Sequence, residues 1–235
     1  MTISNKRLSL VLDKISILGP EAKVLDVGGG MFPLGAATHV IDFLPYQKPK
    51  SWHGNGTFKF SKDTWYVCDI NRDKFPFENN FFDFVFSSHT LEDIVFPFNA
   101  MDEIMRVGKE GYIETPSLGW EITKNIQGKG ICGAQHHKWC VKLDEIDSNC
   151  ILFIEKSDCI YRSPLYRQSK RAYLKSGESD AMSFYWKDSF SYKHVTNFDT
   201  LATYEFFNDF VSERDKIKKL ISKNRFTKNL FNSFF

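Results

Sequence analysis

The most constraining feature of the sequence is a short apolar run that breaks into three consecutive glycines. Residues 24–27 read Val-Leu-Asp-Val, and Gly28, Gly29 and Gly30 follow at once. The run predicts a buried parallel strand, and the glycines predict a tight turn at its C-terminal end, where a chain without Cβ atoms lets a ligand approach the backbone N–H groups. Open α/β sheets bind ligands beyond the carboxyl ends of their strands, so the stretch predicts a nucleotide-type cofactor on the glycine turn.

The residues around the turn help to choose between cofactors. The dinucleotide fingerprint is Gly-x-Gly-x-x-Gly, and Pro33 stands where its third glycine belongs. This disfavours a nicotinamide-dependent oxidoreductase. Asp26 precedes the first glycine and is not part of that fingerprint. An acid there suits a ligand with a cationic end, such as the ammonium group of a methionine moiety.

Short apolar runs alternate with helical and loop segments in the first half of the chain, which predicts a parallel α/β sheet. The span from Gly30 to Asp42 is too short for a full crossover helix, so one helical turn or a loop is expected there. Ser4 is a candidate N-cap of the first helix. We expect strands at residues 23–27, 39–42, 65–70, 81–88 and 111–116, helices at 2–18 and 97–107, and a surface loop at 43–63.

Acidic residues end or open several of these strands. Asp42 ends the second strand, where a carboxylate can accept hydrogen bonds from both ribose hydroxyls; the alternative is a turn acid at a strand end. Asp83 opens the fourth strand between two phenylalanines and is expected to accept hydrogen bonds from neighbouring backbone N–H groups. Glu92 and Asp93 follow that strand and are expected to cap a helix.

Length and composition indicate one soluble α/β domain with additions, with two small domains as the alternative. The 235-residue chain carries a formal net charge of +2, which gives no electrostatic reason to expect a nucleic-acid partner. No apolar stretch approaches the roughly 18 residues of a transmembrane helix, and no signal-peptide pattern opens the chain. Five cysteines without framework spacing fit reduced thiols, which predicts a cytoplasmic protein.

Together these motifs resemble the class I, Rossmann-like S-adenosylmethionine-dependent methyltransferases. The stretch VLDVGGG at residues 24–30 resembles the family's first motif, Asp42 its ribose ligand, and Asp69-Ile70 the pair that meets the adenine. The block FPFENNFFDFVFSSHTLED at residues 75–93 resembles the later motifs of the family. The likeness covers residues 20–116.

The chain departs from the family pattern in two ways. The crossover after Gly30 is shortened, and Asp93 stands where the family often carries His. Short-crossover sequences with a later His-basic-Trp block occur among methyltransferases near surface-polysaccharide genes, and this chain resembles that branch.

The resemblance implies a fold, a cofactor and a site. The fold is a Rossmann-like three-layer sandwich with a mostly parallel sheet, closed by an antiparallel hairpin at residues 141–143 and 149–155, plus a C-terminal aromatic and helical extension. The cofactor is S-adenosylmethionine. The residues implied to bind it are Asp26, Gly28, Gly29 and Gly30 at the methionine part, Asp42 and Phe43 at the ribose, Asp69 and Ile70 at the adenine, and Ser87, Ser88 and His89 under the sulfonium. From the residues alone, Asp69 could equally cap a turn and Ile70 could belong to the core.

A glycine-rich stretch and a histidine pair mark the second half of the chain. Residues 116–136 are expected to form a substrate lid, with an ordinary surface loop as the alternative. His136 and His137 are candidates, with His89, for the general base of an acceptor hydroxyl; the alternative is a strand with one ring packed and one in water. Cys132, His136, His137 and Cys140 have loosely ligand-like spacing, but structural zinc sites show cleaner pairs, so no metal is expected.

The chain is expected to divide at residue 160. Residues 1–160 form the cofactor-binding core, and residues 161–235 form an extension packed on it. Within the extension we expect a basic aromatic helix at 164–175, an aromatic strand covering the pocket at 184–195, and a basic amphipathic helix at 199–224.

These observations favour an S-adenosylmethionine-dependent methyltransferase that O-methylates a small-molecule or sugar-type acceptor. The alternative is a catalytically silent methyltransferase-fold binding subunit. Nucleic-acid methylation is disfavoured, because Ser87-Ser88-His89-Thr90 stands where base-flipping relatives carry an Asn/Asp-Pro-Pro-aromatic block. The oligomeric state is left open.

Overall fold

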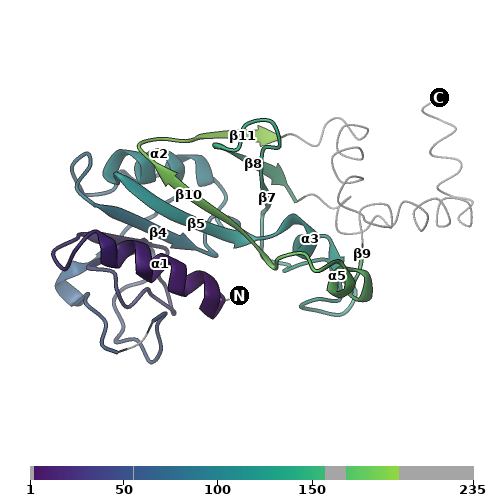
Figure 1. The fold of residues 1–235 in the computed structure, drawn as a ribbon, viewed down its shortest axis with the longest axis horizontal. Helices are drawn as coiled ribbons and strands as arrows, with labels where there is room; N and C mark the ends of the chain where they lie inside the picture. The colour runs from purple at the N-terminus through teal and green to yellow at the C-terminus, as the bar shows by residue number, and fades with distance from the viewer. Residues whose placement is uncertain (1–2, 55, 157–167, 196–235) are drawn as a thin grey trace, which may run out of the picture.

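The chain folds around one sheet of six strands in the order β10-β5-β4-β1-β2-β3. The computed structural model describes residues 3–54, 56–156 and 168–195; in its main sheet β10 runs antiparallel beside β5, and the other neighbours pair in parallel. The strands are β1 (Val24–Val27), β2 (His39–Asp42), β3 (Trp65–Val67), β4 (Phe84–Ser88), β5 (Glu110–Pro116) and β10 (Ala181–Lys187). The predicted fold class, a mostly parallel α/β sheet, is confirmed (Figure 1).

One helix covers each face of this sheet, which makes three layers (Figure 1). Helix α1 (Asn5–Ile17) begins at Ser4, whose side chain accepts a hydrogen bond from the Arg7 N–H as an N-cap. Helix α2 (Pro97–Val107) lies on the opposite face. Because successive strand residues point to opposite faces, Val24 packs in the α1 cluster and Leu25 in the α2 cluster.

The connection from β1 to β2 contains no helix, as its length predicts. Residues 28–38 form turns, and Leu34 from their middle is fully buried on the α1 face. Phe60 from the following loop is buried on the same face, next to Trp65. Side chains from two loops therefore fill space beside α1. The second loop ends in the short 3-10 helix η1 (Lys62–Thr64).

The element that closes the main sheet differs from the prediction. The expected hairpin forms as β7 (Trp139–Leu143) and β8 (Cys150–Glu155), but it builds a second sheet with β11 (Ser191–Val195). The main sheet is closed by β10 instead. Its buried residues Phe184 and Trp186 belong to the α2-side core, and this explains why β10 pairs along the whole of β5. The aromatic stretch expected to cover the pocket is thus split between two sheets.

Two strands are shorter than expected, and both changes have a local cause. β3 ends at Val67, because the chain turns at Asp69, whose carboxylate accepts the Asn71 N–H. β4 begins only at Phe84. Asp83, just before it, accepts the Lys23 N–H at 2.9 Å, the structural role that was expected of it.

The stretch predicted to be a lid begins as a buried structure. Helix α3 (Leu118–Glu121) and β6 (Thr123–Lys124) follow β5, and the side chains at 117–123 are buried. β6 pairs with β9 (Gln168–Ser169), which leads into α5 (Lys170–Ser176). The more exposed parts of the stretch are residues 124–131 and 135–136.

The structure covers the predicted helices of the extension only in part. Within the described residues, the helix expected at 164–175 runs over 170–176, and residues 164–167 lie outside them. The helix expected at 199–224 lies outside the described residues altogether. The division at residue 160 stays a prediction, although β10 from the second segment is built into the main sheet.

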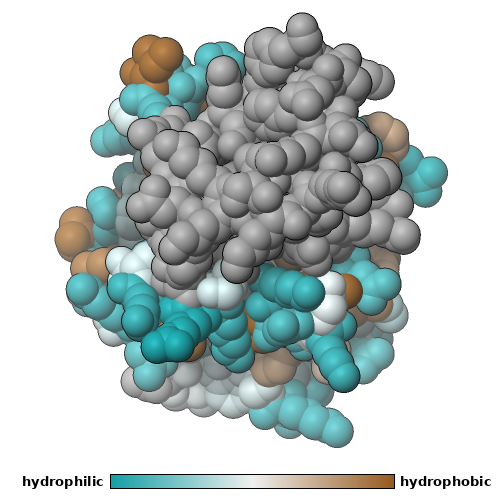
Figure 2. Space-filling view, turned by 90° about the vertical axis from the view of Figure 1, so that its right-hand side faces the viewer, coloured by the Kyte–Doolittle hydropathy of each residue, from teal (hydrophilic) through white to brown (hydrophobic). Residues whose placement is uncertain are grey.

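The coloured part of the surface in Figure 2 is mostly hydrophilic, with apolar residues scattered among polar ones. Such isolated apolar residues are ordinary on globular proteins. None of the helices in the described part of the chain is both long and apolar enough to cross a bilayer.

Trp186 tests whether β10 is a structural part of the core. Replacing it with Ala should lower the free energy of unfolding by about 3–5 kcal/mol, since a large buried ring is lost from the α2-side cluster. The neighbouring exposed Lys187→Ala on the same strand is the control and should stay within about 0.5 kcal/mol. Denaturant unfolding followed by circular dichroism measures both. Equal, small effects would mean that β10 does not contribute to this core.

Candidate functional site

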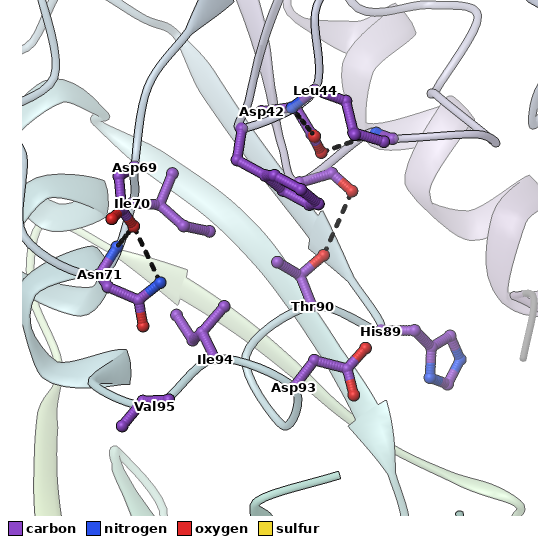
Figure 3. A pocket seen from close by; sticks show the side chains of 13 residues that line it. Asp42, Leu44, Asp69, Ile70, Asn71, His89, Thr90, Asp93, Ile94 and Val95 are labelled. Carbon is purple, nitrogen blue, oxygen red and sulfur yellow. Dashed lines mark hydrogen bonds between the residues drawn. The ribbon is translucent and has the colours of Figure 1, made fainter. Parts of the chain in front are cut away.

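A pocket of about 560 Å³ lies at the carboxyl ends of the central parallel strands. The chain runs from β1 to β2 on one side and from β4 to β5 on the other, so the pocket sits at the point where the strand order reverses. Figure 3 shows the side chains that line it, contributed by four strand ends. They are Gly28, Gly30, Asp42, Phe43, Leu44, Asp69, Ile70, Asn71, His89, Thr90, Asp93, Ile94 and Val95.

The glycine turn forms the floor between the two sides. Gly28 and Gly30 have φ values of +79° and +44°, a region that favours glycine. A Cβ atom on Gly28 would also lie 2.3 Å from the Thr90 side chain. The positive φ values and the close Thr90 side chain therefore explain why glycine stands in this turn.

The expectation that the glycine N–H groups meet the ligand is wrong for two of the three. The Gly28 N–H donates to the Ile41 carbonyl at 2.8 Å, and the Gly30 N–H donates to the Asp42 carboxylate at 2.9 Å. Both N–H groups are therefore already used within the fold. Gly29 does not line the pocket, because its Cα faces inward, where a Cβ would lie 2.8 Å from the Asp26 carboxylate.

Asp26 is buried behind the turn, away from the pocket wall. Its side chain accepts the Leu34 N–H at 2.7 Å and is only 2% exposed. Burial raises its pKa to about 7, against the opposing effect of the Leu34 hydrogen bond. Asp26 therefore shapes the loop after the glycines, and the structure does not bring it to the ligand side.

Asp42, Phe43 and Asp69 line the side of the pocket formed by β2 and β3. The two Asp42 carboxylate oxygens accept the N–H groups of Gly30 and Leu44, so this carboxylate is held firmly at the strand end. Phe43 is 69% exposed beside it, a large apolar surface open to a ligand. Asp69 accepts two hydrogen bonds from Asn71, which lower its pKa.

His89 ends β4 in a strained conformation, with φ +53° for a residue with a Cβ. Its ring is nearly buried, with Nε2 3.1 Å from Glu114 and Nδ1 3.4 Å from Glu92. Burial alone would lower its pKa, but the two carboxylates outweigh it and raise the pKa to about 9. At neutral pH His89 therefore carries its proton, which argues against its expected role as a general base.

The serines before His89 do not line the pocket. Ser87 is buried, and its hydroxyl donates to the Val27 carbonyl. Ser88 also lies outside the pocket wall. β4 thus presents His89 and Thr90, rather than its serines, to a ligand.

His136 and His137 lie beside Asp93, which lines the pocket, but neither histidine lines it itself; we call this group the outer edge of the pocket. The His136 side chain is 65% exposed, while His137 is buried and pairs with Glu121 of α3. One ring is thus exposed to solvent and the other is packed, as the alternative reading of this pair expected. Among the described residues, Cys132 and Cys140 do not lie with the two histidines in a group that could hold a metal ion. Burial also raises the pKa of the Cys140 thiol above its ordinary value.

Sequence reasoning missed several pocket residues. Glu92 and Asp93 do not cap a helix, since α2 begins at Pro97 without a side-chain cap, and Asp93 lines the pocket instead. For the other missed residues, the only signal in the sequence was their position shortly after the end of a predicted strand. The missed residues are Leu44, Asn71, Thr90, Asp93, Ile94 and Val95.

Residues 26–113 match the family model described as a methyltransferase domain. The matched region runs from β1 into β5 and includes every residue that lines the pocket. The match indicates S-adenosylmethionine as the cofactor.

Several solved structures are similar in part. A methyltransferase from Mesorhizobium loti is 14% identical over 47% of this chain and 56% of its own, with a TM-score of 0.32. One from Aquifex aeolicus is 20% identical over 49% of this chain and 69% of its own, with a TM-score of 0.29. A chain of the complex between the Haloferax volcanii Trm112 methyltransferase activator and a putative methyltransferase is 16% identical over 48% of this chain and 57% of its own, with a TM-score of 0.30.

These likenesses carry no argument about activity. The chain spans little more than half the length of two of these structures, 56% and 57%. No curated protein matches the sequence significantly.

The charge state of His89 can be tested through Glu114. In the wild type, the His89 ring should titrate near pH 9, and Glu114→Gln should lower that pKa, because a carboxylate 3.1 Å from Nε2 loses its charge. Glu110→Gln, at the far end of β5, is the control and should leave the titration unchanged. Nitrogen chemical shifts of the labelled imidazole report the pKa. A wild-type titration in the ordinary histidine range would refute the assignment.

Asp26 should make folding weaken as the pH rises. Its pKa of about 7 in the fold lies above the ordinary carboxyl range, so below about pH 4 both states hold the proton, and between pH 4 and 7 only the unfolded state releases it. Asp26→Asn keeps an oxygen for the Leu34 N–H but has no proton to release. Relative to this variant, the wild type should lose on the order of a few kcal/mol of unfolding free energy from pH 4 to 7.

Urea unfolding at several pH values measures the difference. The exposed Asp63→Asn is the control, and it should follow the wild type. Parallel pH profiles for the wild type and Asp26→Asn would show that Asp26 titrates normally.

Proposed function

We propose that this protein is an S-adenosylmethionine-dependent methyltransferase that methylates a hydroxyl of a small-molecule or sugar-type acceptor. The observation that carries the proposal is the chemistry of the pocket wall. Three carboxylates, those of Asp42, Asp69 and Asp93, line the pocket, and none of its lining residues in the described part of the chain is a lysine or an arginine. Such a wall suits a ligand with hydroxyls and positive charge.

The same wall disfavours a nicotinamide cofactor. A dinucleotide places its pyrophosphate on free N–H groups at a helix N-terminus. Here the Gly28 and Gly30 N–H groups have partners within the fold, and residues 28–38 contain no helix. An anion would find neither of these two donors nor a helix dipole at this turn.

The lining residues fit the three parts of S-adenosylmethionine. Asp42 would accept hydrogen bonds from the ribose, with Phe43 covering its apolar side. Asp69 and Ile70 would meet the adenine edge and face, and Asn71 and the exposed Val95 would extend that wall. Glycine carbonyls and the acidic wall would face the methionine part.

When bound, S-adenosylmethionine supplies a methyl group on a sulfonium whose sulfur leaves as a neutral thioether. The contribution of this chain is then mainly alignment, which can be worth roughly 7–11 kcal/mol. A hydroxyl acceptor also has to lose its proton. Because His89 already carries one, His136 and His137 at the outer edge are the proposed acceptors of that proton.

The proposal also covers the class of acceptor and the location of the protein in the cell. The sugar-type acceptor follows from the resemblance to short-crossover methyltransferases near surface-polysaccharide genes. A cytoplasmic location is proposed because the five cysteines of the chain lack the spacing of a disulfide framework.

Calorimetry with S-adenosylmethionine, S-adenosylhomocysteine and NADH tests the cofactor. We expect micromolar binding of the first two and none of NADH. Binding of NADH alone would overturn the proposal. Failure of all three to bind would favour the silent binding subunit.

Two substitutions test the residue assignments. Asp42→Ala should weaken S-adenosylhomocysteine binding at least about tenfold, because hydrogen bonds to a charged group contribute about 1.5–3 kcal/mol each. Since Asp42 also holds the Gly30 and Leu44 N–H groups, thermal unfolding must be measured in parallel. Phe43→Ala leaves those bonds in place and should weaken binding without loss of stability. Asp63→Ala, an exposed acid outside the pocket, is the control. Unchanged affinity in both pocket variants would refute the assignment.

A further inference from the structure

Two histidines and one carboxylate meet at the outer edge of the pocket. The Nε2 atoms of His136 and His137 each lie 3.7 Å from Oδ1 of Asp93. One ligand atom from each residue falls within 4.8 Å of the others. Metal–ligand bonds of 2.0–2.2 Å place neighbouring ligand atoms on the order of 3–4 Å apart, so the three groups need to move little to share an ion.

One oxygen of the carboxylate at the centre of this group has no hydrogen-bond donor among the described residues. Asp93 Oδ1 is shielded from solvent, yet it accepts no hydrogen bond from any residue that the structure describes. A shielded carboxylate oxygen without a donor is unfavourable unless a cation or a proton compensates it. The two imidazoles approach it too distantly for hydrogen bonds, at 3.7 Å.

A second carboxylate orients one of the imidazoles. Glu121 of α3 pairs with Nδ1 of His137, and the same Glu121 pairs with the buried Lys156. A carboxylate that accepts the Nδ1 proton fixes the tautomer in which Nε2 carries the lone pair, and this arrangement is the usual outer partner of a metal-bound histidine. His137 is thus turned with Nε2 toward Asp93.

We propose that Asp93, His136 and His137 bind a divalent first-row transition-metal ion such as Zn²⁺, Fe²⁺ or Co²⁺. Two imidazole nitrogens and one carboxylate oxygen suit these ions better than Mg²⁺ or Ca²⁺, which prefer oxygen ligands. Three protein ligands leave coordination positions open to water or to an oxygen of a substrate.

The place of the ion links it to the reaction. Asp93 belongs both to the ligand group and to the pocket wall, so an acceptor hydroxyl could bind the ion while it faces the pocket. An ion lowers the pKa of a bound hydroxyl and so takes over the task given above to the two imidazoles. This role rests on the proposed function, whereas the binding of the ion does not.

Cobalt provides the direct probe. The full-length protein, freed of metal with a chelator, is titrated with Co²⁺ and followed by its visible d–d bands and by calorimetry. We expect one ion per chain and no thiolate charge-transfer band, because the cysteines are not ligands. His136→Ala and Asp93→Asn should each weaken binding by more than the roughly 10–100-fold typical of losing an outer partner. Glu121→Gln should fall within that smaller range.

The variants separate ligation from folding. His136 is largely exposed, so its substitution should leave the thermal unfolding curve unchanged. His194→Ala removes an exposed histidine of β11 outside the group and should bind Co²⁺ like the wild type. No Co²⁺ binding to the wild type, equal binding to His136→Ala, or a thiolate band would overturn the proposal.

Calorimetry with S-adenosylmethionine in the presence of chelator keeps the two ideas apart. Cofactor binding without Co²⁺ binding would refute the metal site alone. Co²⁺ binding without cofactor binding would refute the proposed function and leave the metal site standing.

Discussion

The glycine turn after β1 depends on two buried carboxylates, which accept backbone hydrogen bonds in place of a crossover helix. A crossover helix would satisfy the backbone N–H groups that follow the glycines. Here Asp26 accepts the N–H of Leu34, and Asp42 accepts those of Gly30 and Leu44. Burial raises the pKa of both acids, a sign that their charge is unfavourable where they stand. The hydrogen bonds that they accept compensate part of that cost and make the short crossover possible.

This constraint also decides what the pocket can bind. The N–H groups of Gly28 and Gly30 are used inside the fold, and the Asp42 carboxylate lies beside the turn, so the turn is unfavourable for a phosphate. On the opposite side, charges of alternating sign run from α1 into the pocket. Arg7 pairs with Glu114, Glu114 faces His89, and His89 faces Glu92. The N-terminal helix is thereby tied to the end of β4, where His89 holds its strained conformation.

Most of the main sheet was predictable because its signals are local. Apolar runs marked β1, β2, β4 and β5, and the span after Gly30 correctly predicted a connection without a helix. The partner of β5 was not predictable in this way. The hairpin β7–β8 and strand β10 both contribute residues to the α2-side core, so their apolar residues did not indicate which of them pairs with β5.

The site was predictable to the extent that position after a strand determines it. Asp42, Asp69 and His89 lie at strand ends and line the pocket as expected. The orientation of a side chain is not encoded so locally. Asp26 has the spacing of a ligand residue, yet the Leu34 N–H draws its carboxylate to the other side. The charge of His89 depends on Glu114, which comes from a different strand.

The same long-range pairing explains why the outer edge of the pocket matters for chemistry. With its proton held between two carboxylates, His89 can stabilise negative charge but cannot take a proton from an acceptor at neutral pH. In the proposed reaction, activation of an acceptor would then fall to groups that reach the pocket from elsewhere in the chain. Asp93 is the residue through which this can occur, since it lines the pocket and lies 3.7 Å from both histidines. Glu121 and Lys156 hold His137 in place from behind, so the pair is positioned by the segment after β5 rather than by the sheet itself.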